Sequence, residues 1–375
     1  MTRTALIYSP ISAHYSISEG HPLRPHRLEL TYDMLKAYGA FDTPDSSLLA
    51  PEPVTDMAAL SYHSLDYVDA VKRISRGEKV FNASKYNIVP YGDNPPYESM
   101  YDISMLAVGG SLLGARLIHE GKYDAVFNIT GGYHHAQINF ASGFCIFNDI
   151  VIAIKWLTRQ GLLVAYVDID AHHADGVQNA FRDWPRVLDI SLHESGKYLF
   201  PGSGDASDIG TEEGEGYTIN IPFEPDTDDE VYLWAFREIV PPLVNRFKPD
   251  VLVTQLGCDT NYNDPLTHMM LTTHGYAEAV RELKKLCPKW LAVGGGGYDV
   301  STVGRSWTLA YGIMMGRDWP DETPLVIQEK YGIKRLRDNE GPDISPATRK
   351  QCFKAARETV AELKRTVFPV HGLVT

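Results

Sequence analysis

The chain has 375 residues, 44% of them hydrophobic and 22% charged, and its formal net charge is −13. This apolar content excludes a disordered chain, because burial of these side chains can offset the lost conformational entropy. The acidic balance and the lack of any Lys/Arg-rich run argue against phosphate neutralisation, so we predict no stable nucleic-acid binding. A neutral or cationic substrate suits this charge better.

The sequence predicts neither a membrane span nor a signal peptide. The longest stretch without a charged residue, 125–148, contains two His, three Asn and a Gln, which a membrane span would not carry. The apolar run in residues 1–10 is too short for a signal peptide and predicts a first strand. Four widely spaced cysteines match neither a metal motif nor a disulfide framework. We therefore expect reduced thiols and a cytoplasmic location.

Short apolar runs typical of buried parallel strands recur along the chain, at residues 125–129, 162–168, 187–193, 217–221, 251–256 and 290–294. Amphipathic stretches between them predict helices at 99–119, 148–159, 228–247 and 273–286. A capping-box pattern, Thr227-x-x-Glu230, marks the start of the third helix, and Pro241-Pro242 should kink or interrupt it. The alternation predicts an α/β fold with three layers in a single domain.

Two segments depart from this alternation. Residues 82–96 are rich in Pro, Asn, Tyr and Gly and predict a long ordered loop that shapes a site. Residues 317–350 are charged and contain prolines, and a last helix over 346–364 should pack on the outside of the domain.

A cluster of ionisable residues follows the strand predicted at 162–168. Asp170 and His172 are two residues apart, so on a locally extended chain they project to the same side and are able to share a metal ion. Strand-end Asp and His also cap helices, but five ionisable groups within residues 168–175 are too costly to gather without a compensating ion.

Two adjacent histidines follow the strand at 125–129. Gly131-Gly132 allows a tight turn and a close backbone approach before His134 and His135. Histidine is the natural proton carrier near neutral pH. Asp168 and Asp175, if they do not bind the metal, can each accept a hydrogen bond from one imidazole and fix its tautomer.

Two further clusters end strands. Asp259 supplies a plausible third ligand, and an Asp-His-Asp set leaves a position open for water or substrate. Four glycines, 294–297, precede Tyr298, but the segment lacks the Lys-Ser/Thr of a phosphate-binding loop. A turn that presents the Tyr298 hydroxyl to a developing oxyanion fits better.

Taken in order, these motifs resemble the zinc-dependent histone deacetylase family, and most of all its bacterial acetoin-utilisation-type members. The motifs are residues 20–27, 131–136, 143–145, 168–178, 191–193, 257–259 and 294–298. The resemblance implies an arginase-deacetylase type fold with a mostly parallel sheet. It also implies a catalytic domain at residues 1–316 and a C-terminal extension, 317–375, packed on the same domain.

The resemblance implies a role for each site residue. Zn2+, or Fe2+ or Co2+, would be held by Asp170, His172 and Asp259, and the residues of the catalytic group would be His134, His135, Asp168, Asp175 and Tyr298. Gly143, Phe144, Phe200 and Leu266 match the walls of an acyl-lysine channel, and Asp93 matches a rim carboxylate that holds the substrate backbone.

The family also has structural sites for K+ or Na+. The first would be built around Asp168 with oxygens of Asp170, His172, Ser191 and Leu192. The second would use backbone oxygens of Phe181, Trp184, Val187 and Tyr217.

The implied reaction is hydrolysis of the amide that joins an acetyl or short acyl group to a lysine side chain of a protein. An acetylpolyamine amidohydrolase is the main alternative, with a small acetylated amine as substrate. A binuclear ureohydrolase would need another acidic residue shortly after Asp259, where Thr260-Asn261 follows. A non-catalytic binding module would be expected to lack one of the site residues. The oligomeric state is left open.

Overall fold

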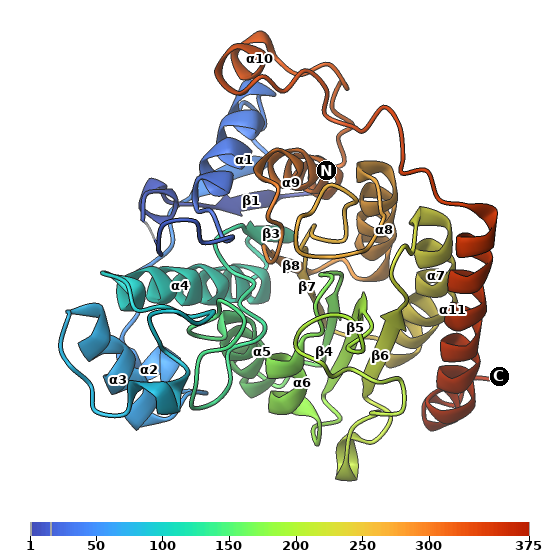
Figure 1. Cartoon of the computed structure of the whole chain (residues 1–375), viewed down its shortest axis with the longest axis horizontal. Helices are drawn as coiled ribbons and strands as arrows, with labels where there is room; N and C mark the ends of the chain where they lie inside the picture. The colour runs from blue at the N-terminus through green and yellow to red at the C-terminus, as the bar shows by residue number, and fades with distance from the viewer. Residues whose placement is uncertain (1, 16, 375) are drawn as a thin grey trace.

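A parallel β-sheet forms the centre of the computed structural model, which describes residues 2–15 and 17–374 (Figure 1). Its eight strands have the order β2-β1-β3-β8-β7-β4-β5-β6, and every pairing is parallel. The strands are β1 (Thr4–Ile7), β2 (Ser46–Leu49), β3 (Ala125–Asn128), β4 (Val164–Asp168), β5 (Val187–Glu194), β6 (Thr218–Phe223), β7 (Val251–Gln255) and β8 (Trp290–Val293).

Helices cover both faces of the sheet and enclose two hydrophobic cores (Figure 1). One face carries α1 (His26–Ala37), α7 (Asp229–Phe247), α8 (Thr273–Leu286), α9 (Val300–Met315) and α11 (Pro346–Thr366). The other carries α3 (Leu65–Ser75), α4 (Met100–His119), α5 (Asp149–Arg159) and α6 (Asp175–Phe181). Two further α-helices are α2 (Asp56–Ala59) and α10 (Leu325–Tyr331). The predicted three-layer α/β domain is confirmed.

The seven strands expected from the sequence are present, and the helices predicted at 99–119, 148–159, 273–286 and 346–364 are found within two residues of those bounds. Strand β2 was not predicted. Its sequence is Ser-Ser-Leu-Leu, and only Ser46 is buried, so it lacks the apolar signature of the other strands.

Helix α7 differs from the prediction at its start and at its two prolines. The helix begins after Asp228, whose side chain accepts a hydrogen bond from Val231 N at 3.2 Å, because the Thr227 hydroxyl donates instead to the Glu224 carbonyl. Its expected interruption at Pro241-Pro242 is wrong, since one helix spans both prolines. Flanking apolar side chains hold it on the core through this region; they are Ile239, Val240, Leu243 and Val244, all fully buried.

The C-terminal segment packs on the α/β body. Helix α11 lies against α7 and β6, and Arg349 Nε donates to Asp228 Oδ2 at 2.5 Å. A domain boundary at residue 316 stays a prediction.

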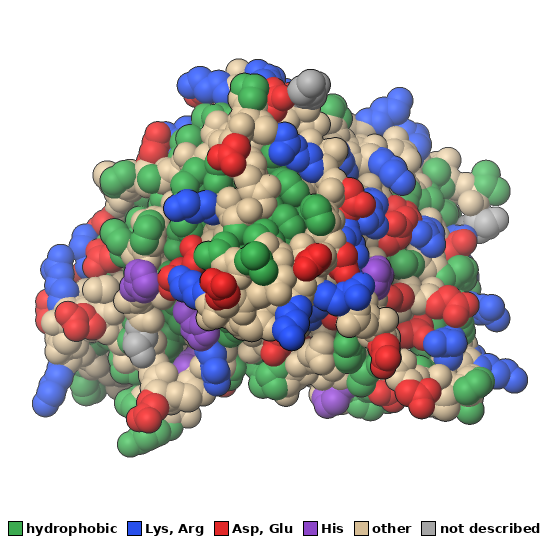
Figure 2. All heavy atoms as spheres, turned by 90° about the horizontal axis from the view of Figure 1, so that it is seen from above, with side chains coloured by type: hydrophobic (Ala, Val, Ile, Leu, Met, Phe, Trp, Pro, Cys, Tyr) green, Lys and Arg blue, Asp and Glu red, His purple; other side chains and the backbone are tan. Residues whose placement is uncertain are grey.

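Helix α4 is the one helix among the described residues that is long and apolar enough to span a membrane, but 72% of its most apolar window is buried in the fold. Figure 2 shows acidic and basic side chains interspersed over one face of the molecule.

Candidate active site

Four loops meet at the carboxyl edge of the sheet. The register pairs Asp168 with Gln255, Gln255 with Val293, and Val293 with Asn128, so the ends of β4, β7, β8 and β3 lie at one level. Ligand sites of open parallel sheets lie beyond this edge. The topology therefore brings together the four clusters singled out in the sequence.

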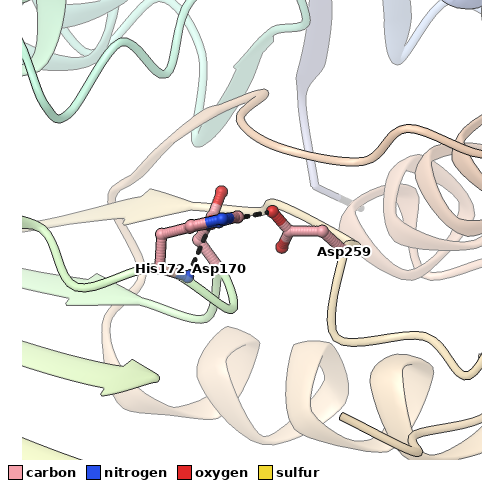
Figure 3. A group of neighbouring side chains, drawn as sticks. All are labelled: Asp170, His172 and Asp259. Carbon is pink, nitrogen blue, oxygen red and sulfur yellow. Dashed lines mark hydrogen bonds and ion pairs between the residues drawn. The ribbon is translucent and has the colours of Figure 1, made fainter. Parts of the chain in front are cut away.

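Asp170, His172 and Asp259 form a buried group that suits a metal ion (Figure 3). Their nearest ligand atoms all lie within 4.8 Å of one another. Nδ1 of His172 lies 3.0 Å from Asp170 Oδ1 and 3.0 Å from Asp259 Oδ2, so one imidazole nitrogen faces both carboxylates. No second such group occurs among the described residues.

Neighbouring donors orient the two carboxylates. Asp170 Oδ2 accepts hydrogen bonds from Gln255 Nε2 at 2.6 Å and from Gly296 N at 2.7 Å, and Asp259 Oδ1 accepts one from Ala171 N at 2.8 Å. Burial and the nearby charge of Asp170 raise the pKa of Asp259 to about 7. A cation between the carboxylates would relieve this repulsion, and two oxygens with one nitrogen suit a divalent metal.

The histidine pair lies beside this group, and each ring is paired with its own carboxylate. His134 Nδ1 lies 2.8 Å from Asp168 Oδ2, and His135 Nδ1 lies 2.6 Å from Asp175 Oδ1. The two Nε2 atoms are 3.1 Å apart. His134 Nε2 also lies 4.0 Å from Asp170 Oδ1, which places the pair directly against the metal group.

The environments of the two rings differ in charge. Burial opposes protonation of His134, but the adjacent carboxylates of Asp168 and Asp170 outweigh it and raise its pKa to about 9. Burial and the neighbouring imidazoles lower the pKa of His135 well below its ordinary value. The pair is therefore suited to hold one charged and one neutral imidazole.

Aromatic rings line the approach to these histidines. The Phe200 ring lies 4.9 Å from the His135 ring, and the Tyr298 ring lies 5.8 Å from Phe144 and 6.3 Å from His172. Gly143 has φ +49°, and a Cβ there would lie 2.4 Å from the His135 ring and 2.8 Å from Phe200. A side chain at position 143 would fill this space, so glycine keeps it open.

The two remaining predicted substrate residues lie on other loops. Asp93 is exposed, and its backbone oxygen lies 3.4 Å from His21 Nε2, while the His21 ring packs edge-on against Phe144 at 4.7 Å. Leu266 is half-buried on the loop that follows Asp259. Asp93 is thereby tied through His21 to the Phe144 wall.

Three of the positions expected to form the second K+ or Na+ site lie close together. Trp184 N donates to the Phe181 carbonyl, and Val187 N donates to that of Trp184, so these carbonyls lie in one turn after α6. Asp189 N, in the next strand, donates to the Tyr217 carbonyl at 2.8 Å. Both cation sites stay predictions.

Comparison with known proteins agrees with this arrangement. The family model of the histone deacetylase domain matches residues 21–314. The acetoin utilization protein AcuC of Bacillus subtilis (strain 168) is 38% identical over 331 residues, which cover 86% of this chain and 85% of that protein. The chain belongs to the histone deacetylase family.

Plant and bacterial family members extend this finding. Histone deacetylase 2 of Oryza sativa subsp. japonica is 34% identical over 332 residues, 88% of this chain but 65% of that longer protein. A crystal structure of a histone deacetylase homologue from Aquifex aeolicus superposes with a TM-score of 0.84 at 29% identity, covering 94% of this chain and all of that one. A homologue complexed with SAHA gives a TM-score of 0.87 at 29% identity, covering 96% of this chain and all of that one. The chain is thus a deacetylase by family.

Several residues that hold this deacetylase site together were not predicted. Gln255 Oε1 accepts from Gly257 N at 2.6 Å while its amide holds Asp170. Asp149 accepts hydrogen bonds from Gly132 N and Tyr133 N and so fixes the turn before the histidines. Arg27 NH1 donates to the Gly297 carbonyl at 2.8 Å. Arg27 lies inside the motif at 20–27 and Gln255 lies in the strand predicted at 251–256, but their partners are not visible in the sequence.

His63 supports the histidine pair from outside. Its Nδ1 lies 2.9 Å from the Gln137 carbonyl, and Nε2 accepts from Asn148 N at 2.9 Å. The Gln137 side chain donates to Asp175 Oδ2 and to the His135 carbonyl. His63 therefore holds the segment that carries the proton-transfer pair.

We expect His63 to make the deacetylase acid-sensitive. Burial lowers its pKa from 6.5 to about 4, so between these values the unfolded chain binds more protons than the folded chain. The contribution of His63 to the free energy of unfolding is fully present above pH 6.5. It falls by up to about 3 kcal/mol as the pH approaches 4. Urea unfolding of wild type and His63→Gln at pH 7 and 4.5 checks this. Equal losses of stability in both proteins would contradict it.

Proposed function

We propose that this deacetylase uses a divalent ion, Zn2+ foremost, to remove acetyl or short acyl groups from lysine side chains of proteins. One observation carries the proposal: Asp170, His172 and Asp259 face the carboxylate-paired His134 and His135 across a few ångströms. Protein-lysine hydrolysis is favoured over acetylpolyamine hydrolysis by the exposed Asp93 at the channel mouth.

A divalent ion held by Asp170, His172 and Asp259 would supply the activation that amide hydrolysis needs. When bound, the ion would polarise the acyl oxygen and lower the pKa of a water molecule toward neutrality. Asp170, His172 and Asp259 would hold it, and Gln255 and the Gly296 amide would keep Asp170 aimed at it.

Proton transfer is assigned to the histidine pair. His135, neutral because its pKa is depressed, would accept a proton from the attacking water, with Asp175 fixing its tautomer. The same ring would then donate that proton to the leaving amine. His134, held protonated by Asp168 and Asp170, would balance charge as the oxyanion develops.

The aromatic walls suit an acylated lysine. Rings of Phe144 and Phe200 flank the approach to His135, and an uncharged aliphatic stem would lie between them. The Tyr298 hydroxyl, whose ring lies 6.3 Å from the His172 ring, would donate to the developing oxyanion. We also propose K+ or Na+ at the Asp168 and Phe181 sites, a catalytic domain ending near residue 316, and a cytoplasmic location.

A side-by-side assay tests the substrate class. We expect a higher kcat/KM for acetyl-lysine peptides than for acetylspermidine or acetylputrescine, because Asp93 would bind peptide amides that polyamines lack. Each charged hydrogen bond is worth roughly 1.5–3 kcal/mol when buried, and rim exposure should bring it toward the low end. Asp93→Ala should therefore lower kcat/KM about tenfold on peptides and leave acetylpolyamines unchanged.

Glu98→Ala is the matched control, since Glu98 is another exposed acid close to this loop. It should leave both substrate classes unaffected. Acetylpolyamines exceeding every peptide by tenfold or more would reassign the substrate to the polyamine class and leave the hydrolytic chemistry in place.

A further inference from the structure

Asp338 is a buried carboxylate in the C-terminal segment, beyond the part of the chain that the family model matches. Its Oδ1 accepts a hydrogen bond from Arg305 NH1 at 2.6 Å. Its Oδ2 accepts from Thr273 N at 2.8 Å and from Asn261 Nδ2 at 3.4 Å. Its backbone N donates to Thr273 Oγ1 at 2.8 Å, and its carbonyl lies 3.0 Å from His274 Nε2. Asp338 is thus held on both its side chain and its backbone.

The partners of Asp338 belong to elements that carry the site. Asn261 lies two residues after Asp259, on the same loop. Arg305 lies in α9, which starts two residues after Tyr298, and its NH2 also donates to Thr302 Oγ1 in the first turn of that helix at 3.3 Å. One carboxylate from the C-terminal segment therefore joins the Asp259 loop to the start of α9.

A second connection runs from this loop to the tyrosine itself. Asp264 N donates to the Asn261 carbonyl at 2.8 Å, so the two residues form one turn. The Asp264 carboxylate accepts from Tyr298 N at 2.8 Å and from Leu266 N at 2.9 Å. A shift of the loop at Asn261 would therefore reach the Tyr298 backbone as well as Asp259.

We propose that Asp338 is a positioning residue of the deacetylase reaction, which sets the Asp259 loop and the Tyr298 turn relative to each other. The proposal rests on the proposed function, because it assigns Asp259 to the metal and Tyr298 to the oxyanion. Displacements well under 1 Å at such groups lower turnover, while the Phe144 and Phe200 rings, which lie on other segments, would keep their place. Losing Asp338 should therefore change kcat and metal affinity and leave KM alone.

The test compares Asp338→Ala and Asp338→Asn with Asp228→Ala in the full-length chain. Asp228 is the matched control, because it is also buried, accepts from one backbone N and one Arg, and ties the C-terminal segment to the body. The assay is acetyl-lysine peptide hydrolysis per folded enzyme, well below each variant's Tm, with Zn2+ affinity measured separately by chelator competition.

For Asp338→Ala we expect kcat about tenfold lower, KM within about twofold of wild type, and Zn2+ affinity about tenfold weaker. Asp338→Asn keeps one acceptor oxygen and should show a smaller loss in the same direction. Asp228→Ala should lower Tm and leave kcat and Zn2+ affinity unchanged.

Equal kcat and Zn2+ affinity in wild type and Asp338→Ala, with only Tm lowered, would overturn the proposal. If Asp338→Ala does not fold, Asp338→Asn with unchanged kcat and Zn2+ affinity would overturn it equally. If wild type hydrolyses no acyl-lysine substrate, the proposed function fails by itself, and the Zn2+ affinity of the Asp338 variants still decides the positioning role.

Discussion

Replacing Asp259 by Ala should remove the divalent ion and almost all deacetylase activity while the fold survives. Asp259 supplies one of three ligand side chains, and it lies within 4.8 Å of the other two. A catalytic metal contributes several kcal/mol to transition-state stabilisation, so its loss should lower kcat/KM by at least about 1000-fold. Metal analysis of purified wild type should give one tightly bound divalent ion per chain, and Asp259→Ala should give close to none.

A matched carboxylate elsewhere separates metal loss from general destabilisation. Asp229, the first residue of α7, accepts hydrogen bonds from Thr272, which caps the start of α8. The Thr272 backbone N donates at 2.8 Å and the Thr272 hydroxyl at 2.6 Å. Asp229→Asn should lower Tm and retain both metal and activity. Two tightly bound divalent ions in wild type, or undiminished activity in Asp259→Ala, would refute the single-metal site.

Much of the fold was predictable because parallel strands covered on both faces are apolar throughout. This signature marks Val251–Gln255, which is buried at every residue, and it is missing from β2, whose Ser46 is its one buried residue. Propensity misled at Pro241-Pro242, where fully buried neighbours such as Val240 and Leu243 hold the helix together. Packing against the core decided the outcome at these prolines.

The meeting of the site clusters was predictable from topology alone. Carboxyl ends of parallel strands share one edge, so clusters that follow β3, β4, β7 and β8 had to lie near one another once the sheet was parallel. The sequence did not say which carboxylate serves which ring; the structure pairs Asp168 with His134 and Asp175 with His135.

The supporting contacts were not predictable, because they join residues far apart in the chain and depend on side-chain direction. Asp149 reaches back 17 residues to Gly132, and Asn261 and Asp338 are 77 residues apart. The sequence shows which residue stands at each of these positions, but it does not indicate which distant residue that side chain contacts.

Tyr298→Phe isolates the contribution of one hydroxyl. If that group donates to the oxyanion, kcat should fall by about two to three orders of magnitude, the usual effect of losing one oxyanion donor, while KM and metal content stay near wild type. The Phe ring would keep the contacts with Phe144 and His172. Steady-state kinetics on an acetyl-lysine peptide, with metal analysis of the same preparation, measures this.

Tyr276→Phe makes the same chemical change behind the site. The Tyr276 hydroxyl is buried and donates to the Leu256 carbonyl at 2.9 Å, so its loss should cost about 1 kcal/mol of stability and leave kcat within a few fold of wild type. Equal kcat losses in the two variants would mean that Tyr298 acts by packing. A large loss confined to Tyr298→Phe separates the two roles, because both variants remove one phenol hydroxyl and only Tyr298 lies at the metal group.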